Sequence, residues 1–339
     1  MTEKMKSVCV GRFLVDVPAN AAVMLSREMM DGYTIVTVEE IEMAFRERIT
    51  ARGAAIQSPG SAVDGTGGMV EASDLHVPGM IGRKFVFGRN RGYLMEGDRR
   101  IDDEDVSVEV HGHTGGMSFS LSMKNADVAD ADLAEGLLAR LRRRGEDEVP
   151  TGPGFCIWRG FFVEPLPAHA TEHIVMHIGL PRHPDVGIAF ASLPGGGTTR
   201  SLLKRVKDMD AEAGADEMLR VTKLRTGKRH INDLSGEEVL ERVRELNFAT
   251  TFGFVWETEG VKYNPLKPFL SLELHSGISL EPAARPADSS LHEDAVLALW
   301  DMISSSIRMR PTSLPLPAGH SPLPEPKLGA IANPGNAFP

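Results

Sequence analysis

The chain has 339 residues, enough for two domains, and its 42% hydrophobic and 25% charged content is ordinary for a globular protein. A formal net charge of −10 disfavours nucleic-acid and membrane-surface partners, because an acidic surface repels phosphate groups and anionic lipid. No apolar run approaches the roughly 20 residues of a membrane-spanning helix, so direct membrane insertion is not expected. The first residues, MTEKMKSVCVGRF, lack an apolar signal core, which predicts either a cytoplasmic protein or a chain whose leader has been removed.

The first half of the chain begins with strand patterns. Residues 8–17 alternate in a β-rich run and predict a strand. Asp31-Gly32 separates two further apolar runs and is a hairpin signal. Apolar residues then recur every four positions within 38–52, which predicts a helix, and the Gly/Ser/Pro-rich stretch 53–68 predicts a loop.

A second group of strands precedes another helix. The runs KFVFG and YLMEG predict strands, and VSVEVHGH and MSFSLSM predict a hairpin around Thr114-Gly115-Gly116. The leucine spacing within 128–143 predicts a helix with arginines in its last turn. The charged and then Pro/Gly-rich segment 144–154 is the expected linker and hinge between two domains.

The second half repeats the plan of the first. FCIWRGFFVEPLP matches VCVGRFLVDVP in having a cysteine, an arginine three residues later, an apolar run, an acid and a proline. Each half also ends with a pair of strand patterns followed by a helix, which spans 291–306 in the second half. We therefore predict an α+β fold of two similar lobes, each an antiparallel sheet with packed helices, forming a pseudo-repeat. The segment 235–246 stays open between a capped helix and a strand.

The expected boundaries are an N-terminal domain over 1–148, a C-terminal domain over 149–310 and a tail over 311–339. The tail contains eight prolines and cannot form a core of its own. Cys9 and Cys156 each lie in an apolar strand-like run and are interpreted as two buried small hydrophobic residues. Whether they pair with each other stays open at this point.

One histidine-rich segment has the spacing of a zinc site. His169, Glu172 and His173 form the H-x-x-E-H pattern that binds zinc on a helix, and His177 lies one turn further. The sequence HIVMHIG is β-branched and alternating, however, which favours a strand on which Glu172 and His173 point to opposite faces. A zinc hydrolase is therefore the lesser alternative for this chain.

Other catalytic motifs are incomplete. His111 and His113 lie two residues apart at a hairpin end, and the sequence places no acidic or cysteine partner beside them. The serines lack the G-x-S-x-G pattern of a nucleophile elbow, and the glycine run at 195–199 lacks the lysine of a phosphate-binding loop. We expect no catalytic residue, no cofactor and no metal, and hence not an enzyme.

Two features are candidates for contact with another protein. A four-acid run precedes a predicted strand, and its ordinary interpretation is a solvated loop, its functional one an acidic contact surface. The three tryptophans are first interpreted as core residues, but Trp256 lies near a turn and is the one to consider at an interface. The candidate partner-binding residues are Asp102, Asp103, Glu104, Asp105, Trp256 and Glu257.

Several segments resemble the lipase-immunity family of type VI secretion, whose members pair with phospholipase effectors. The resemblance is carried by VCVGRFLVDVP, GFCIWRGFFVE, LSGEEVLERVRE and FVWETEGVKYNPLKPFLSLELHSG, and it covers about residues 7–310. It implies two α+β lobes that clasp a toxin and block its access to lipid, with no activity and no cofactor.

The resemblance also implies a cognate phospholipase toxin as partner and a periplasmic location, although the first residues show no export signal. We expect a monomer when the protein is free. The alternative from another class is a non-enzymatic envelope or scaffold protein of the same fold that binds a different partner.

Overall fold

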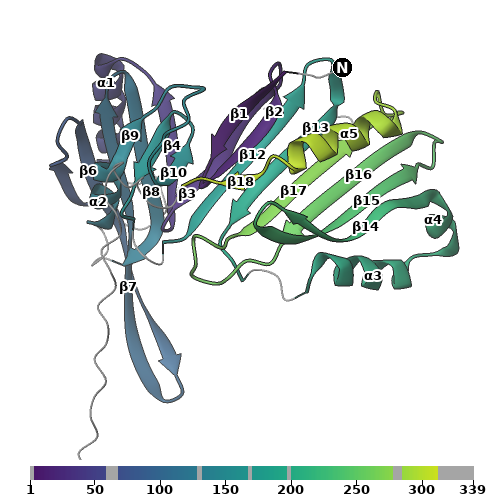
Figure 1. The fold of residues 1–339 in the computed structure, drawn as a ribbon. Helices are drawn as coiled ribbons and strands as arrows, with labels where there is room; N and C mark the ends of the chain where they lie inside the picture. Colours follow the sequence, from purple (N-terminus) through teal and green to yellow (C-terminus); the bar gives the residue numbers. More distant parts are fainter. Residues whose placement is uncertain are drawn as a thin grey trace, which may run out of the picture.

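The computed structural model describes residues 4–58, 68–127, 132–166, 170–196, 200–277 and 285–311. Its main feature is a twelve-stranded antiparallel sheet in the order β14-β15-β16-β17-β13-β12-β3-β4-β8-β7-β6-β5 (Figure 1). The first half contributes β3 (Ala22–Met30), β4 (Tyr33–Glu39), β5 (Met69–Asp74), β6 (Ile81–Glu96), β7 (Arg99–Thr114) and β8 (Met117–Asp127). The second half contributes β12 (Glu172–Leu180), β13 (His183–Leu193), β14 (Val221–Ile231), β15 (Leu234–Arg244), β16 (Thr250–Thr258) and β17 (Phe269–Ser276).

The strand order repeats between the two halves. Counted outward from the middle of the sheet, the first half follows β3-β4-β8-β7-β6-β5 and the second follows β12-β13-β17-β16-β15-β14. If the six strands of each half are numbered in chain order, strands one and two are followed in the sheet by strands six, five, four and three. Helical segments lie between the second and third strands of each half, and another helix follows the sixth. The two halves therefore share one strand plan, built mostly of antiparallel sheet with few helices.

The expectation of a separate sheet in each lobe is wrong. The central strands β3 and β12 pair with each other from Glu172–Met30 to Gly179–Ala22, which joins both halves into one sheet. β3 pairs with β4 only through Met29–Thr34 and Met30–Tyr33. An unpaired edge leaves backbone N–H and C=O groups without partners, and β3 finds most of its partners in the other half.

Two small sheets exchange strands between the halves. The six strands are β1 (Met5–Val10), β2 (Phe13–Pro18), β9 (Leu141–Arg143), β10 (Gly154–Ile157), β11 (Gly160–Val163) and β18 (Arg308–Met309). β9, which ends the first half, pairs with β11 of the second half, and β18, which ends the second half, pairs with β2 of the first. Each half is therefore completed by a strand from the other.

The segment 144–154 is anchored, which contradicts a free hinge there. Arg144 directly follows β9, is buried, and donates to the backbone carbonyls of Glu148, Ile157 and Gly160 at 2.9–3.2 Å. Arg310 directly follows β18 and is buried in the same way. Its guanidinium donates to carbonyl oxygens within the segment itself, those of Pro150, Gly152 and Gly154.

Cys9 and Cys156 form a disulfide bond, which answers the question of pairing that the sequence left open. Both are buried, as expected, but their Cα atoms lie 5.9 Å apart because β1 and β10 lie against each other. Gly11 and Cys156 also exchange two backbone hydrogen bonds of 2.9 Å. The two copies of the repeated motif, each with one cysteine, thus lie against each other, and the disulfide bond links the two halves covalently.

In the described part of the chain, five helices cover parts of the sheet. They are α1 (Glu42–Gln57), α2 (Leu133–Arg140), α3 (Leu202–Glu212), α4 (Ala215–Arg220) and α5 (Glu293–Ser304). α1 extends beyond the predicted helix into 53–57, while the rest of the predicted loop, apart from Ser58 and Gly68, lies outside the described residues. α2 is shorter than predicted because Leu141–Arg143 pairs as β9, and 128–131 lies outside the described residues.

The helices bury apolar stripes against the strands. In α1, Phe45, Ile49 and Ile56 pack into a cluster with Phe85 and Phe87 of β6. The buried face of α5 consists of Val296, Leu299, Trp300 and Ile303, which join the main core. None of the described helices is both long and apolar enough to cross a membrane.

The open segment 235–246 is a strand rather than a helix, since β15 is hydrogen-bonded to β14 on one side and β16 on the other. Its buried Glu238 accepts a hydrogen bond of 2.7 Å from the indole Nε1 of Trp300 and ion-pairs with Arg225 and Arg229. Because Trp300 belongs to α5, this carboxylate fixes the helix to the sheet.

Two other buried carboxylates connect the first half of the chain to the second. Glu172 of β12 accepts hydrogen bonds of 2.7 and 2.5 Å from the guanidinium of Arg12, which follows β1. In the reverse direction, Glu28 of β3 accepts a hydrogen bond of 2.5 Å from the backbone N–H of Trp158, between β10 and β11. Burial raises the pKa of Glu28 to about 7, although the bond from Trp158 and the charge of Arg144 both act to lower it.

Replacing both Cys9 and Cys156 with alanine is expected to lower the free energy of unfolding by about 2–5 kcal/mol, because the bond restricts the unfolded chain over a separation of 147 residues. Urea denaturation with and without a reductant measures the effect. The reductant should bring the native protein to the stability of the double variant and leave the variant unchanged. Equal stability of the two oxidised proteins would contradict the prediction.

The native protein is expected to lose free energy of unfolding as the pH rises, because Glu28 ionises, and the substitution Glu28→Gln is expected to abolish this loss. The ordinary pKa of 4.5 in the unfolded chain and about 7 in the folded one mean that the contribution of Glu28 is complete below pH 4.5 and is lost as the pH rises through 7. The native protein should lose on the order of 3 kcal/mol relative to the variant across this range. Unfolding free energies at a series of pH values test this, and parallel pH profiles would refute it.

Candidate protein-binding surface

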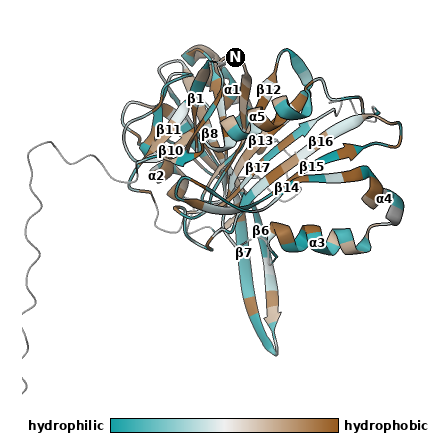
Figure 2. Ribbon diagram, turned by 45° about the vertical axis from the view of Figure 1, so that its right-hand side comes forward, coloured by the Kyte–Doolittle hydropathy of each residue, from teal (hydrophilic) through white to brown (hydrophobic). Residues whose placement is uncertain are grey.

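The β6–β7 pair extends beyond the sheet as a two-stranded projection (Figure 1). The strand register shifts between Phe87 and Asn90, next to Gly88 at φ 64°, and such a bulge redirects a strand pair. Beyond the bulge, residues 90–105 form the segment that we call the ribbon. Every residue from 89 to 103 is exposed, and Figure 2 shows the ribbon as mixed hydrophilic and hydrophobic segments standing clear of the sheet.

The acidic run lies within the ribbon, so its interpretation as a loop before a strand is wrong. Asp102, Asp103, Glu104 and Asp105 are paired residues of β7, opposite Tyr93, Gly92, Arg91 and Asn90 respectively. Arginines support the run, since Glu104 binds Arg91 at 2.9 Å and Asp102 binds Arg100 at 2.8 Å. The Glu104–Arg91 pair crosses between the strands and the Asp102–Arg100 pair lies along β7, and such pairing of opposite charges allows four consecutive acids in one strand. The carboxylates of Asp102 and Asp103 stay exposed.

Trp256 lies in the core, and the hypothesis that it contacts a partner is wrong. Its side chain is fully buried, and its indole Nε1 donates to the carbonyl of Arg229 at 3.2 Å. β16 is an interior strand of the sheet, and alternation along it turns Trp256 toward the core and Glu257 toward the opposite face.

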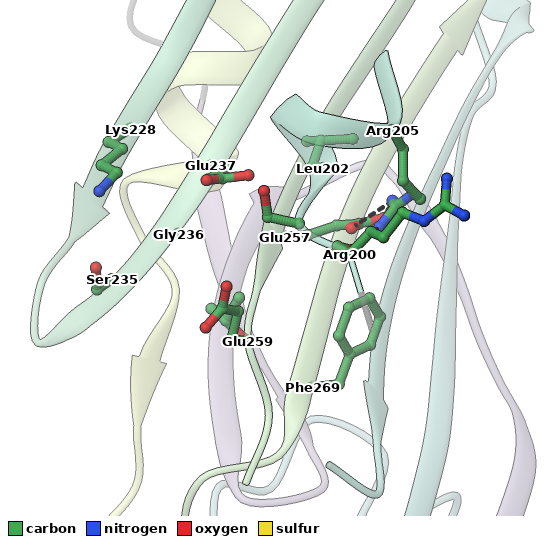
Figure 3. A pocket seen from close by; sticks show the side chains of 12 residues that line it. Arg200, Leu202, Arg205, Lys228, Ser235, Gly236, Glu237, Glu257, Glu259 and Phe269 are labelled. Atoms are coloured by element: carbon green, nitrogen blue, oxygen red, sulfur yellow. Dashed lines mark hydrogen bonds and ion pairs between the residues drawn. The ribbon is translucent and has the colours of Figure 1, made fainter. Parts of the chain in front are cut away.

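Glu257 lines a pocket of about 340 Å³ between α3 and the strands of the second half (Figure 3). Its carboxylate takes both bonds from the guanidinium of Arg205, at 2.7 and 2.9 Å. Glu237 accepts the backbone N–H of Leu203 at 2.9 Å in the first turn of α3. Both carboxylates therefore attach this helix to the sheet.

The charges in this pocket are mixed. Figure 3 shows the carboxylates of Glu237, Glu257 and Glu259 between Lys228 on one side and the arginines Arg200 and Arg205 on the other. Three acids and three bases give the pocket no strong field of one sign. Of the glycine run in the sequence, Gly195 and Gly196 lie against Val261 and Lys262, and 197–199 lies outside the described residues.

Two histidines of the possible zinc motif lie on a strand. His173 and His177 belong to β12, whereas Glu172 is buried against Arg12 on the other face, and His169 lies outside the described residues. Burial and the nearby charge of Arg27 lower the pKa of His173. Among the described residues, no three His, Cys, Asp or Glu side chains gather as metal ligands do.

His111 and His113 are buried on β7 and hydrogen-bonded to the adjacent strand. The Nδ1 atom of His111 lies 2.7 Å from the hydroxyl of Ser120, and that of His113 lies 2.9 Å from the hydroxyl of Ser118. His113 also stacks on Phe45 of α1. The Nε2 atom of His111 lies 3.1 Å from the carboxylate of Glu109, which ion-pairs with Arg52 of α1. Both histidines therefore belong to the packing between α1 and the sheet.

The ribbon contains exposed apolar residues that the sequence patterns did not single out. Tyr93, Leu94 and Met95 were predicted as an ordinary strand, and all three side chains are more than half exposed. The sequence contained one signal of this exposure. Residues 93–95 form a short apolar run between two densely charged stretches, and no third strand pattern is present to cover their side chains. Together with the acids, these residues make the ribbon the candidate contact surface.

Family models match both halves of the chain. The N-terminal domain of Tle cognate immunity protein 4 matches residues 6–142, and the C-terminal domain of the same family matches residues 148–312. A search of curated proteins found no match.

Solved structures share the fold. The apo structure of the immunity protein TplEi of the T6SS from Pseudomonas aeruginosa is 22% identical, with a TM-score of 0.71 over 91% of this chain and 98% of that chain. The same protein complexed with an "L" peptide gives a TM-score of 0.67 at 22% identity, over 91% and 99% of the two chains. A chain of the Tle4-Tli4 complex gives 0.72 at 22% identity, over 91% and 98%.

Trp256→Ala is expected to destabilise the fold by about 3–5 kcal/mol, because it empties a fully buried site and removes the hydrogen bond to Arg229. Trp256→Phe, which keeps most of the apolar volume, should lower the free energy of unfolding by clearly less than Trp256→Ala does. Urea denaturation of both variants measures the difference. An alanine variant as stable as the native protein would show that the side chain is not a core residue.

Proposed function

This chain belongs to the family of Tle cognate immunity protein 4, and we propose that it protects the cell that makes it by binding and inhibiting a phospholipase effector of the type VI secretion system. The observation that carries the proposal is the succession of both domain models of this family along one chain, 6–142 and 148–312. The shared fold of TplEi and of a chain of the Tle4-Tli4 complex agrees with it.

Inhibition by binding needs an interface that forms once and releases slowly. A standard interface buries about 1,600 Å², and preorganised partners lose less entropy when they form it. The β3–β12 pairing, the exchanged strands and the Cys9–Cys156 bond support a chain that meets its toxin already assembled. Contact through both halves, with domains over 1–148 and 149–310, is part of this proposal; the tail 311–339 lies, apart from Pro311, outside the described residues.

The acidic residues of the ribbon are proposed to attract the toxin. Asp102 and Asp103 are exposed and lie on a projecting element, where their field meets an approaching molecule first. Complementary charge raises association rates more than it raises final affinity. Glu104 and Asp105 are less exposed and are paired within the ribbon, so their contribution is smaller. Glu257 is held by Arg205 and is not part of this surface.

The proposed location is the periplasm. Disulfide bonds persist in oxidising compartments and are rare in the cytosol, and the Cys9–Cys156 bond joins the two halves of the fold. We also propose that the protein has no turnover of its own and acts as a monomer before it meets the toxin.

The full-length chain is expected to form a stable complex with the lipase encoded beside it and to abolish phospholipid hydrolysis by that enzyme. Co-purification over size exclusion with a catalytically inactive toxin measures binding, and release of fatty acid measures inhibition. The chain alone, assayed as the control, should hydrolyse nothing. A complex in which the lipase stays fully active would reject inhibition. A scaffold protein of the same fold would instead fail to bind the co-encoded lipase, which would reject the immunity role.

A further inference from the structure

The ribbon carries a row of large apolar side chains that the described part of the chain does not cover. Tyr93 is 57% exposed, Leu94 62%, Met95 58% and Ile101 36%. Apolar groups gathered on a projecting element mark an interaction site more often than scattered surface residues do.

These side chains lie on both faces of the ribbon. Residues directly opposite in an antiparallel pair share a face, so Leu94 and Ile101 lie together on one face. Tyr93 and Met95 lie on the other face, with Arg100 beside them. A flat partner could cover only one of the two faces. Only a partner with two walls, a cleft, buries both at once.

The ribbon is preorganised for insertion. The guanidinium of Arg100 lies 4.3 Å from the ring centroid of Tyr93 and binds Asp102 at 2.8 Å. Arg89 and Arg91 both bind Glu104 at the base, at 3.1 and 2.9 Å. These contacts hold the side chains before a partner arrives, which lowers the entropy lost on binding. Seven residues in each arm give a reach of roughly 20 Å.

Charge selects the kind of partner. Between Asn90 and Asp105 the ribbon has six acidic residues, Glu96, Asp98, Asp102, Asp103, Glu104 and Asp105, and three basic ones, Arg91, Arg99 and Arg100, so its net charge is −3. An anionic membrane surface repels such a segment. A protein cleft with a basic rim attracts it.

We propose that the ribbon enters the lipid-binding cleft of the cognate phospholipase, with its apolar side chains on the cleft walls and its acids at the rim. This inference rests on the proposed function and specifies how inhibition occurs. A cleft that admits a phospholipid must accept acyl chains and a phosphate group, and therefore has apolar walls with basic groups nearby. The ribbon presents apolar side chains beside carboxylates, the same two kinds of group. Its insertion excludes the lipid directly.

The first test compares two variants of the full-length chain. Tyr93→Ser with Leu94→Ser alters the ribbon. Leu246→Ser with Phe248→Ser alters the β15–β16 hairpin, which holds the equivalent place in the second half and exposes these side chains at 81% and 72%. The two sites match, because Arg244 lies over the ring of Phe248 as Arg100 lies over Tyr93.

Binding to inactive toxin is followed by biolayer interferometry, with far-UV circular dichroism to check folding. The ribbon variant should bind at least about 100-fold more weakly, chiefly through faster dissociation, while the hairpin variant stays within about threefold of the native chain. Asp102→Lys with Asp103→Lys should slow association at low salt. A hairpin variant weakened as much as the ribbon variant, or a ribbon variant that binds normally, would overturn the proposal.

A second test uses the native chain alone and does not depend on any variant folding. A short-chain phospholipid analogue, kept monomeric, should compete with the chain for the inactive toxin. Simultaneous binding of both would place the ribbon outside the cleft. The native chain should not co-sediment with phosphatidylglycerol vesicles. If it did, and the ribbon variant did not, the ribbon would be a membrane-binding element instead. Failure of the native chain to bind the toxin at all would reject the immunity function itself, a distinct result.

Discussion

The antiparallel pairing of β3 with β12 is the interaction on which the rest of the architecture depends. It uses the innermost strand of each half, so that neither half keeps an unpaired inner edge. Once these strands are paired, the repeated hairpins β1–β2 and β10–β11 lie close enough for the Cys9–Cys156 bond and the Gly11–Cys156 bridge to form. Exchange of β9 and β18 then completes each small sheet with a strand from the opposite half.

Buried charges at this junction are satisfied in two different ways. Arg12 meets the carboxylates of Glu172 and Glu164, which outweigh the effect of burial and raise its pKa. Arg144 and Arg310 instead donate to backbone carbonyls, and burial lowers the pKa of both. Buried cations require such partners, since leaving one unpaired costs several kcal/mol. The connection between the halves is therefore fixed by many directional contacts and does not act as a flexible joint.

A rigid junction has a consequence for binding. A partner that contacts both halves meets surfaces whose relative position is already set, and the ribbon projects from this assembled frame (Figures 1 and 2). Preorganisation favours slow release, which an immunity protein needs because a released lipase damages the cell. The same junction contains the disulfide, a bond that persists in oxidising compartments and is rare in the cytosol.

The sequence by itself determined the local elements and the repeat. The Asp31-Gly32 turn, the hairpin around Gly115-Gly116 and the strand nature of HIVMHIG follow from residue-level preferences that act over a few positions. Only the tertiary structure decided which strands pair over long distances, because pairing depends on which edges meet in space and not on neighbours in sequence. For that reason the joined sheet, the cysteine pairing, the burial of Trp256 and the exposure of Tyr93 and Leu94 required the assembled fold.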